Sequence, residues 1–195
     1  MDISKVIGFT SFLNKFNEVE RTILLKWQDR WENDSEHSFQ LTMLCWYMND
    51  SLQLWLDTSK ILKYALIHDL VEIYAWDTYF YTSNQKELDN KEKREHDAAI
   101  QIAKEFPEFS EMNKLIQEYE LKADDESRFV YAVDKIIPVL NIYLDEWRTW
   151  KKLWVNLDVL LRLKTEKISK CRFASEFWQE FIKKLTKNQE KLFDI

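Results

Sequence analysis

The sequence contains very little glycine and proline, with one Gly and two Pro in 195 residues. Tight β-turns depend on these two residue types, so a sandwich or barrel of many strands would lack the turns that it needs. Phosphate-binding loops of the P-loop or Rossmann type need several glycines, and Gly8 stands alone near the N-terminus. The composition therefore excludes an all-β fold and both of these nucleotide-binding motifs.

Long uncharged stretches are also missing. Asp2, Lys5 and Lys15 interrupt the first twenty residues, and no later stretch runs for 18 residues without a charge. Such a pattern is typical of neither a secretory signal nor a membrane span. We therefore expect a cytoplasmic protein with no membrane partner.

The chain also has fewer basic than acidic residues, and it has only two cysteines. The 28 Lys and Arg residues are outnumbered by 34 Asp and Glu, which gives a net charge of −6. This balance argues against binding of polymeric nucleic acid, although a local basic pocket is compatible with it. Cys45 and Cys171 lie far apart in apolar helical patterns, which favours buried reduced thiols over a disulfide or a zinc site.

What the sequence does have is helical periodicity along most of its length. Residues 18–34 are less regular and predict a loop or a short helix. A kink is expected at Pro138, which falls inside a predicted helix. No repeat or linker divides the chain, so we predict one all-α domain over residues 1–195, a compact helical bundle. The predicted helices span 3–16, 35–48, 58–74, 85–106, 110–123, 126–147, 156–169 and 174–192.

The helix starts and apolar faces follow from the same pattern. We expect Ser35 and Thr58 to cap the second and third helices. The first helix carries apolar residues at helical spacing, which we expect to pack into the core. These residues are Ile3, Val6, Ile7, Phe9, Phe12, Leu13 and Phe16.

Asp134 departs from the pattern of its helix. Its neighbours three and four positions away include Val130 and Ile137, so its carboxylate projects from a largely apolar surface. A buried carboxylate is unfavourable unless an opposite charge or a metal ion compensates it. An ion pair with Arg or Lys, or partial exposure beside Lys135, remains an alternative.

A second polar group follows the apolar run before residue 68. His68, Asp69 and Glu72 lie within one helical turn of each other, so a continuous helix would present imidazole and carboxylate on one face. Histidine nitrogen and carboxylate oxygen suit divalent transition metals. His37, at the start of the helix after Ser35, offers a second nitrogen, whereas His96 lies among charges and is expected on the surface.

The order of these residues resembles a known signature. They lie in RWENDSEHSFQ (30–40), HDLVEIYAWD (68–77) and YAVDKI (131–136). A His, an adjacent His-Asp and a distant Asp in this order resemble the HD-domain metal-dependent phosphohydrolases. Within that superfamily the chain looks most like the bacterial 5′-deoxynucleotidases, which are single-domain helical proteins that remove phosphate from deoxyribonucleoside monophosphates. The resemblance covers roughly residues 1–150.

The resemblance implies roles for individual residues. It implies that one divalent transition-metal ion (Mn, Co, Ni, Fe or Zn) is bound by four ligands, namely His37, His68, Asp69 and Asp134. Glu72 would act on the attacking water, and Asp77 would be a further acidic residue of the active site. Relatives with two or three metal ions need additional histidines, and only His96 is left over.

The resemblance also implies a small-molecule nucleotide as substrate. The relatives carry an Arg-Trp pair upstream of the first His, and here Arg21 stands near that place, followed by Thr22. We expect Arg21 and Arg30 to bind substrate, with a salt bridge to Glu32 or Glu36 as the alternative for Arg30. With Thr22 in place of Trp, the preference for deoxyribose is expected to be modest, unless another tryptophan (Trp27 or Trp31) fills the gap.

Two other functions stay open from the sequence. The substrate of the same chemistry could be another nucleotide or phosphoester. A non-catalytic helical binding protein with a structural metal site is the second alternative, although such a site has no need of Glu72. Several aromatic residues could form a partner surface or a homodimer seam, with core packing as the favoured interpretation: Trp147, Trp150, Trp154, Phe177 and Trp178.

Overall fold

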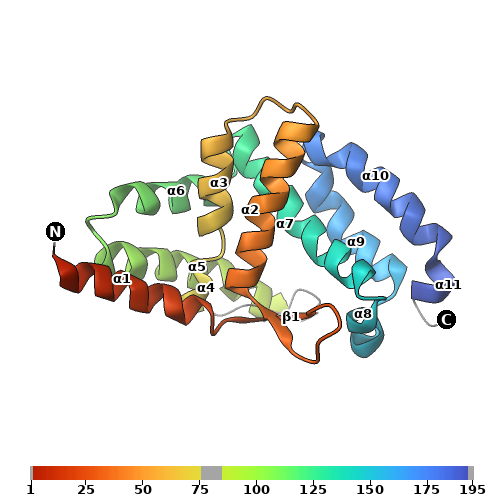
Figure 1. Ribbon diagram of the computed structural model, residues 1–195, viewed down its shortest axis with the longest axis horizontal. Helices are drawn as coiled ribbons and strands as arrows, with labels where there is room; N and C mark the ends of the chain where they lie inside the picture. Colours follow the sequence, from red (N-terminus) through yellow and green to blue (C-terminus); the bar gives the residue numbers. More distant parts are fainter. Residues whose placement is uncertain (1, 76–84, 193–195) are drawn as a thin grey trace.

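The computed structural model describes residues 2–75 and 85–192 and is helical almost throughout (Figure 1). The two strands, β1 (Glu20–Leu24) and β2 (Trp31–Asn33), pair antiparallel. The expected all-α fold is confirmed, with this hairpin as a small addition. The helices are α1 (Ile3–Phe16), α2 (Asp34–Ser51), α3 (Thr58–Ile67), α4 (Glu72–Ala75), α5 (Gln85–Glu105), α6 (Ser110–Leu121), α7 (Asp125–Leu144), α8 (Arg148–Leu153), α9 (Leu157–Ser169), α10 (Arg172–Lys187) and α11 (Gln189–Leu192).

Helix α7 runs through the middle of the molecule (Figure 1). It packs against α2, α3, α9 and α10, and the larger part of its side chains is buried. Helices α1, α5 and α6 lie on one side of it in this view, and α8 to α11 lie on the other. Pro138 is inside α7, so the prediction of a helix that continues through this proline is confirmed.

The hairpin corrects the expected loop or short helix over residues 18–34. Its backbone is tied to distant parts of the chain, because the amide of Leu24 donates to Thr149 Oγ1 (3.0 Å) and the amide of Trp27 donates to Asp145 Oδ1 (2.8 Å). These partners lie more than 100 residues further along the chain. Local sequence alone therefore did not indicate the strands.

The expected caps are each displaced by one or two residues. Helix α2 begins after Asn33, whose side chain accepts from the amide of Glu36 while the Glu36 carboxylate accepts from the amide of Asn33. This reciprocal pair replaces Ser35 as the cap. Helix α3 is capped by Asp57, which directly precedes Thr58.

The predicted helix over 58–74 is wrong in its second half. Helix α3 ends at Ile67, a turn follows over 68–71, and α4 begins at Glu72. The amide of Leu70 donates to the Ile67 carbonyl and that of Glu72 to the Asp69 carbonyl, as in a tight turn. His68 and Asp69 thus lie in a turn between two helices and not on one helical face.

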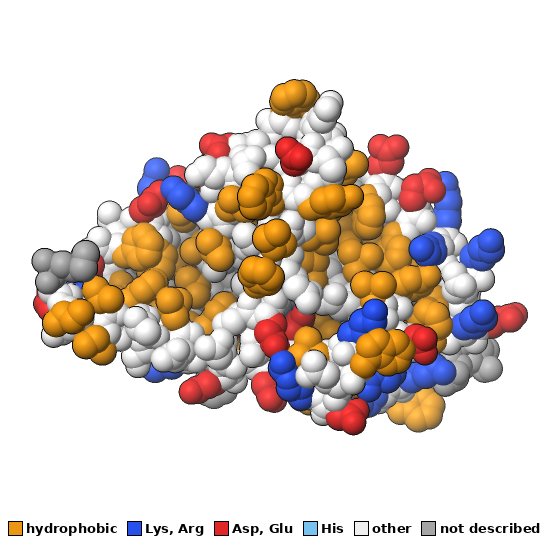
Figure 2. Space-filling model, in the orientation of Figure 1, with side chains coloured by type: hydrophobic (Ala, Val, Ile, Leu, Met, Phe, Trp, Pro, Cys, Tyr) orange, Lys and Arg blue, Asp and Glu red, His pale blue; other side chains and the backbone are white. Residues whose placement is uncertain are grey.

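The surface differs from expectation in two places. In α1 only Phe12 and Phe16 are buried, and four of the residues expected in the core are exposed: Ile3, Val6, Ile7 and Leu13. On α2 four large apolar side chains are exposed, namely Phe39, Met43, Trp46 and Tyr47. Figure 2 shows hydrophobic side chains on the surface in the middle of the view. Amphipathic periodicity identifies the apolar side of a helix, but it does not say whether another element covers that side.

The core contains several residues whose position the sequence left open. Trp150 and Trp178 are buried, so the core interpretation holds for them, whereas Trp154 is almost fully exposed. Cys45 and Cys171 are free and buried, as expected. Among the described residues, no helix combines the length and apolar composition that a bilayer crossing requires.

Candidate metal centre

Four side chains from three parts of the chain meet beside α7. His37 comes from the first turn of α2, His68 and Asp69 from the turn after α3, and Asp134 from the middle of α7. One potential ligand atom from each lies within 4.8 Å of all the others. The structure therefore brings together the four residues that the sequence analysis assigned to a metal ion.

The distances within this cluster suit a divalent ion. Nε2 of His68 lies 2.8 Å from Asp69 Oδ2 and 4.0 Å from Asp134 Oδ1, and Nε2 of His37 lies 3.0 Å from Asp134 Oδ1. Octahedral bonds of about 2.1 Å would place neighbouring ligand atoms about 3.0 Å apart and opposite ones about 4.2 Å apart. Nε2 of His68 is buried as well. Nitrogen and carboxylate oxygen atoms this close together are expected where all of them face a common centre.

Both histidines present Nε2 to the cluster. Nδ1 of His68 donates to the carbonyl of Ala65 at 2.9 Å, which leaves the Nε2 lone pair directed inward. Nδ1 of His37 faces Glu32 Oε2 at 3.7 Å. Burial and the nearby Arg21 guanidinium lower the pKa of His37 to about 4, so its ring is neutral at pH 7, as a metal ligand must be.

The two aspartates are held in the ionised form. Burial by itself would raise their pKa values, but nearby cations and close contacts with the histidines outweigh it. His68 and Arg21 hold the pKa of Asp69 well below its usual range, and Lys135 and His37 do the same for Asp134. Oδ2 of Asp134 lies 2.6 Å from the Lys135 ammonium, while Oδ1 faces the histidines. The ion pair considered from the sequence is present, and Asp134 joins the cluster with its other oxygen.

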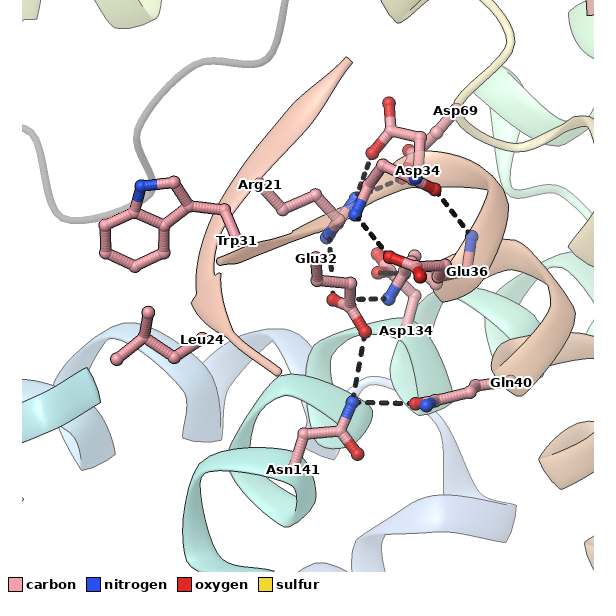
Figure 3. Close-up of polar contacts among 12 residues, drawn as sticks. Arg21, Leu24, Trp31, Glu32, Asp34, Glu36, Gln40, Asp69, Asp134 and Asn141 are labelled. Carbon is pink, nitrogen blue, oxygen red and sulfur yellow. Dashed lines mark hydrogen bonds and ion pairs between the residues drawn. The ribbon is translucent and has the colours of Figure 1, made fainter. Parts of the chain in front are cut away.

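Arg21 points from β1 into the carboxylates of the cluster (Figure 3). Its Nη1 donates to Asp69 Oδ2 at 2.7 Å and to Asp34 Oδ1 at 2.9 Å. Its Nε lies 3.6 Å from Glu32 Oε2. Burial opposes the charge, yet Asp69 and Asp34 raise the pKa of Arg21 further above its normal value. The guanidinium therefore holds β1, β2 and the 68–71 turn around one centre.

Glu32 and Asp34 are the site residues that sequence reasoning missed. Both are fully buried, and Asn141 of α7 donates to Glu32 Oε1 at 3.2 Å and to Gln40 Oε1 at 2.7 Å (Figure 3). Burial raises the pKa of Glu32 to about 7, against the lowering effect of Arg21. In the sequence both residues belong to an acidic run before a helix, which is typical of an exposed N-terminus. Of the sequence motifs that resemble the HD-domain signature, only the segment 30–40 contains these two residues.

Of the two residues predicted to be catalytic, only Glu72 lies among the described residues. Glu72, the first residue of α4, is 4% exposed, and its Oε1 lies 3.7 Å from the Lys91 ammonium. It also forms a second acidic group with Asp34 and Asp69. Asp77 lies outside the described residues.

Arg30 is not brought to the cluster. Its Nη1 donates to Glu36 Oε2 at 3.0 Å, and half of its side chain is exposed. This is the salt bridge that the sequence analysis considered as the alternative to substrate binding. His96, expected on the surface, is exposed.

A cavity of about 370 Å³ opens onto three of the four cluster residues, His68, Asp69 and Asp134. Among the described residues its walls carry cations and carboxylates in equal number. The cations are Arg21, Lys91, Lys122, Lys135, Lys164 and Lys167, and the carboxylates are Asp69, Glu72, Glu92, Glu95, Glu120 and Asp134. With a bound divalent ion, these walls would favour a small anion.

Three comparisons with known proteins bear on the family of this chain. The model of a family described as HD domain matches residues 13–178. The 5′-deoxynucleotidase HDDC2 of Mus musculus is 26% identical over 140 residues, which is 69% of this chain and 68% of that protein. The 5′-deoxynucleotidase hdd1 of Schizosaccharomyces pombe is 22% identical over 153 residues, or 73% of this chain and 75% of that protein.

A solved structure is similar over nearly the whole chain. It is described as a predicted metal-dependent phosphohydrolase from Magnetospirillum magnetotacticum, is 27% identical and superimposes with a TM-score of 0.77. The similarity covers 97% of this chain and 96% of that one.

Proposed function

The chain belongs to the HD domain family of metal-dependent phosphohydrolases, and on that premise we propose that it releases phosphate from nucleoside and deoxynucleoside 5′-monophosphates. The observation that carries the proposal is the group of four potential ligand atoms within 4.8 Å of one another, since three of their residues line a charge-balanced cavity. Two relatives that bear the name 5′-deoxynucleotidase support the substrate class.

We propose that His37, His68, Asp69 and Asp134 hold one divalent ion. Two imidazole nitrogens and two carboxylates suit Mn, Fe, Co, Ni or Zn, and fewer than six protein ligands leave room for water and substrate. When bound, the ion supplies Lewis acidity, which polarises a phosphate oxygen and makes its coordinated water more acidic.

Glu72 is our candidate for the general base. It is buried beside Asp69 and shares an acidic group with it, while Lys91 places a positive charge 3.7 Å from one of its oxygens. A carboxylate at this position would accept the proton of the attacking water as the phosphorus–oxygen bond forms. The alcohol of the nucleoside then leaves with a proton from solvent, and we keep Asp77 as a proposed further acidic residue of the active site.

Arg21 has two tasks in this proposal. It orients Asp69 through a 2.7 Å hydrogen bond, and it lines the cavity where a phosphate oxygen would bind. Arg30 pairs with Glu36 and is absent from the described cavity wall, so its expected substrate contact has weaker support than that of Arg21.

The proposed preference for one sugar over the other depends on Thr22, the residue after Arg21. Thr22 lines the cavity, whereas Trp27 and Trp31 are absent from the described lining. The Lys152 ammonium instead lies over the Trp31 ring, with Nζ 4.6 Å from the ring centroid. A small side chain at the sugar is a weak barrier to the ribose 2′-hydroxyl, so we propose only a modest preference for deoxyribose.

A phosphate-release screen tests the proposal. Purified protein would be assayed with nucleoside mono-, di- and triphosphates in the presence of Mn, Co, Mg or Ni, and its metal content would be measured. Metal-dependent release from monophosphates is the expected result. Release from polyphosphates alone would replace the substrate class, and a tightly bound metal without turnover on any phosphoester would favour the binding protein with a structural site.

A further inference from the structure

Helix α9 builds one wall of the cavity from a part of the chain that the proposed chemistry does not use. Lys164 lines the cavity and is only 4% exposed. Lys167, one turn further along α9, lines the same cavity and is half-buried. The two lysines therefore share a cavity with the residues proposed to hold the metal ion.

The position of Lys164 in its helix is unusual for a lysine. Helix α9 packs against α7 and α10, and the other buried residues of its stripe are Leu157, Leu160 and Ile168. Lys164 occupies the place in this stripe where an apolar residue would pack best. Lysine is rarely buried to this extent in proteins.

The electrostatics distinguish the α9 lysines from the other lysines of the cavity. Glu72 and Glu95 raise the pKa of Lys91 against the effect of its burial, and Asp134 does the same for Lys135. In contrast, burial lowers the pKa of Lys164 well below its usual range and also lowers that of Lys167. Repulsion from Lys135 adds to both shifts, and attraction to Asp134 opposes them. Positive charge is thus crowded at the α9 wall, and a bound anion would relieve the crowding.

We infer that Lys164 and Lys167 bind the phosphate group of the substrate, so that a phosphomonoester dianion lies between the metal ligands and α9. This inference rests on the proposed function and assigns the phosphate end of the ligand to a particular wall. Two ammonium groups can donate several charge-assisted hydrogen bonds to phosphate oxygens. An uncharged nucleoside lacks these bonds and should bind much more weakly than its monophosphate.

The test is titration of inorganic phosphate, and separately of dAMP, into Mn-loaded protein by calorimetry. The variants are Lys164→Met, Lys167→Gln and, as a matched control at the exposed residue that follows α9, Lys170→Gln, whose lysine pairs with Glu166. We expect the Kd for phosphate to rise about tenfold or more in Lys164→Met, to rise by a smaller factor in Lys167→Gln and to stay unchanged in the control. The metal content should be the same in all four proteins.

Thermal unfolding separates a binding role from a structural one. If Lys164 serves the ligand, methionine in the apolar stripe should leave the Tm unchanged or raise it while phosphate binding weakens. A Lys164→Met variant with a lower Tm and unchanged phosphate affinity would overturn the inference. If that variant does not fold, Lys167→Gln decides, since its side chain is only half-buried.

The outcome is distinct from that of the proposed function. Phosphate binding that depends on the two lysines, without hydrolysis of any monophosphate, would contradict the proposed function and support the inference. Hydrolysis of monophosphates with lysine variants that bind phosphate as the wild type does would contradict the inference alone. Failure of the wild-type protein to bind phosphate or dAMP would contradict it as well.

Discussion

The two walls of the cavity hold their charges in different ways. On the side of the hairpin and the 68–71 turn, Arg21, Asp69 and Asp134 lie 2.6–3.0 Å from groups of opposite charge or from histidine. On the α9 side, burial lowers the pKa values of Lys164 and Lys167, and repulsion from Lys135 adds to the shift while Asp134 opposes it. The first wall is built around the Arg21 guanidinium, and the second presents two lysine side chains to the cavity.

The largest effect is expected from removing a ligand on the first wall. Asp134→Ala should abolish metal retention and, with it, phosphate release, because the three other proposed ligands would face the ion without the carboxylate whose Oδ1 lies 3.0 Å from Nε2 of His37 and 4.0 Å from Nε2 of His68. Metal content after dialysis, measured by mass spectrometry, checks this. Asp125→Ala, on the exposed first turn of α7, is the control. A stoichiometric ion of unchanged affinity in Asp134→Ala would remove Asp134 from the ligand set.

Glu72→Gln should lose turnover while it keeps the metal. The amide preserves the shape of the side chain but cannot accept a proton, and loss of a general base typically lowers kcat by about 10² to 10⁴. Steady-state kinetics beside metal analysis would test this, with Glu92→Gln on the same cavity as the control. Wild-type kcat would exclude the role, and loss of the metal would make Glu72 a ligand.

Arg21→Gln tests whether the first wall depends on one cation. Three buried or half-buried carboxylates would lose their shared partner, so we expect a fall of about 3 kcal/mol in the free energy of unfolding. Denaturant unfolding measures it, and kcat/KM for dAMP should fall in parallel. A variant as stable as the wild type would show that the carboxylates are compensated by other groups.

The sugar preference should be a smaller effect. We expect kcat/KM for dAMP to exceed that for AMP by about tenfold at most, because Thr22 leaves room beside the sugar. Thr22→Trp should increase the ratio. A ratio above roughly 10³ in the wild type would mean that a bulky side chain reaches the sugar from elsewhere.

The smallest effect is expected at Arg30. Because its guanidinium pairs with Glu36 at the exposed start of α2, Arg30→Gln should change kcat/KM by less than about threefold. Kinetics with dAMP check this value. A loss of tenfold or more would restore Arg30 as a contact of the substrate.

Much of the helical architecture could be predicted because it follows from local hydrophobic periodicity in the sequence. The bounds of α5 and α9 agree with prediction to within one residue at each end. The hairpin could not be predicted in this way, since its amides depend on Asp145 and Thr149. The 68–71 turn could not be predicted either, because it has neither glycine nor proline and interrupts an apolar run that favours a helix.

Only some residues of the candidate site could be predicted, for a similar reason. The histidines and aspartates could be predicted because polar residues interrupt apolar helical stretches there and resemble a known signature. Lys164 gave the same kind of signal, as a lysine among Leu157, Leu160 and Ile168, but lysine is so common on helix surfaces that the signal was missed. Glu32 and Asp34 gave none, because acidic residues before a helix are ordinary.

The separation of the two walls along the chain has a consequence for biosynthesis. Arg21 and Lys164 are 143 residues apart (164 − 21), yet they line one cavity. A nascent chain carries all four proposed ligand residues once α7 has been synthesised, whereas the lysines of α9 emerge later. Contacts between such distant segments form late, because the intervening chain must first be ordered. All six carboxylates and four of the six cations of the described cavity wall are present by the end of α7, and synthesis of α9 adds the last two cations.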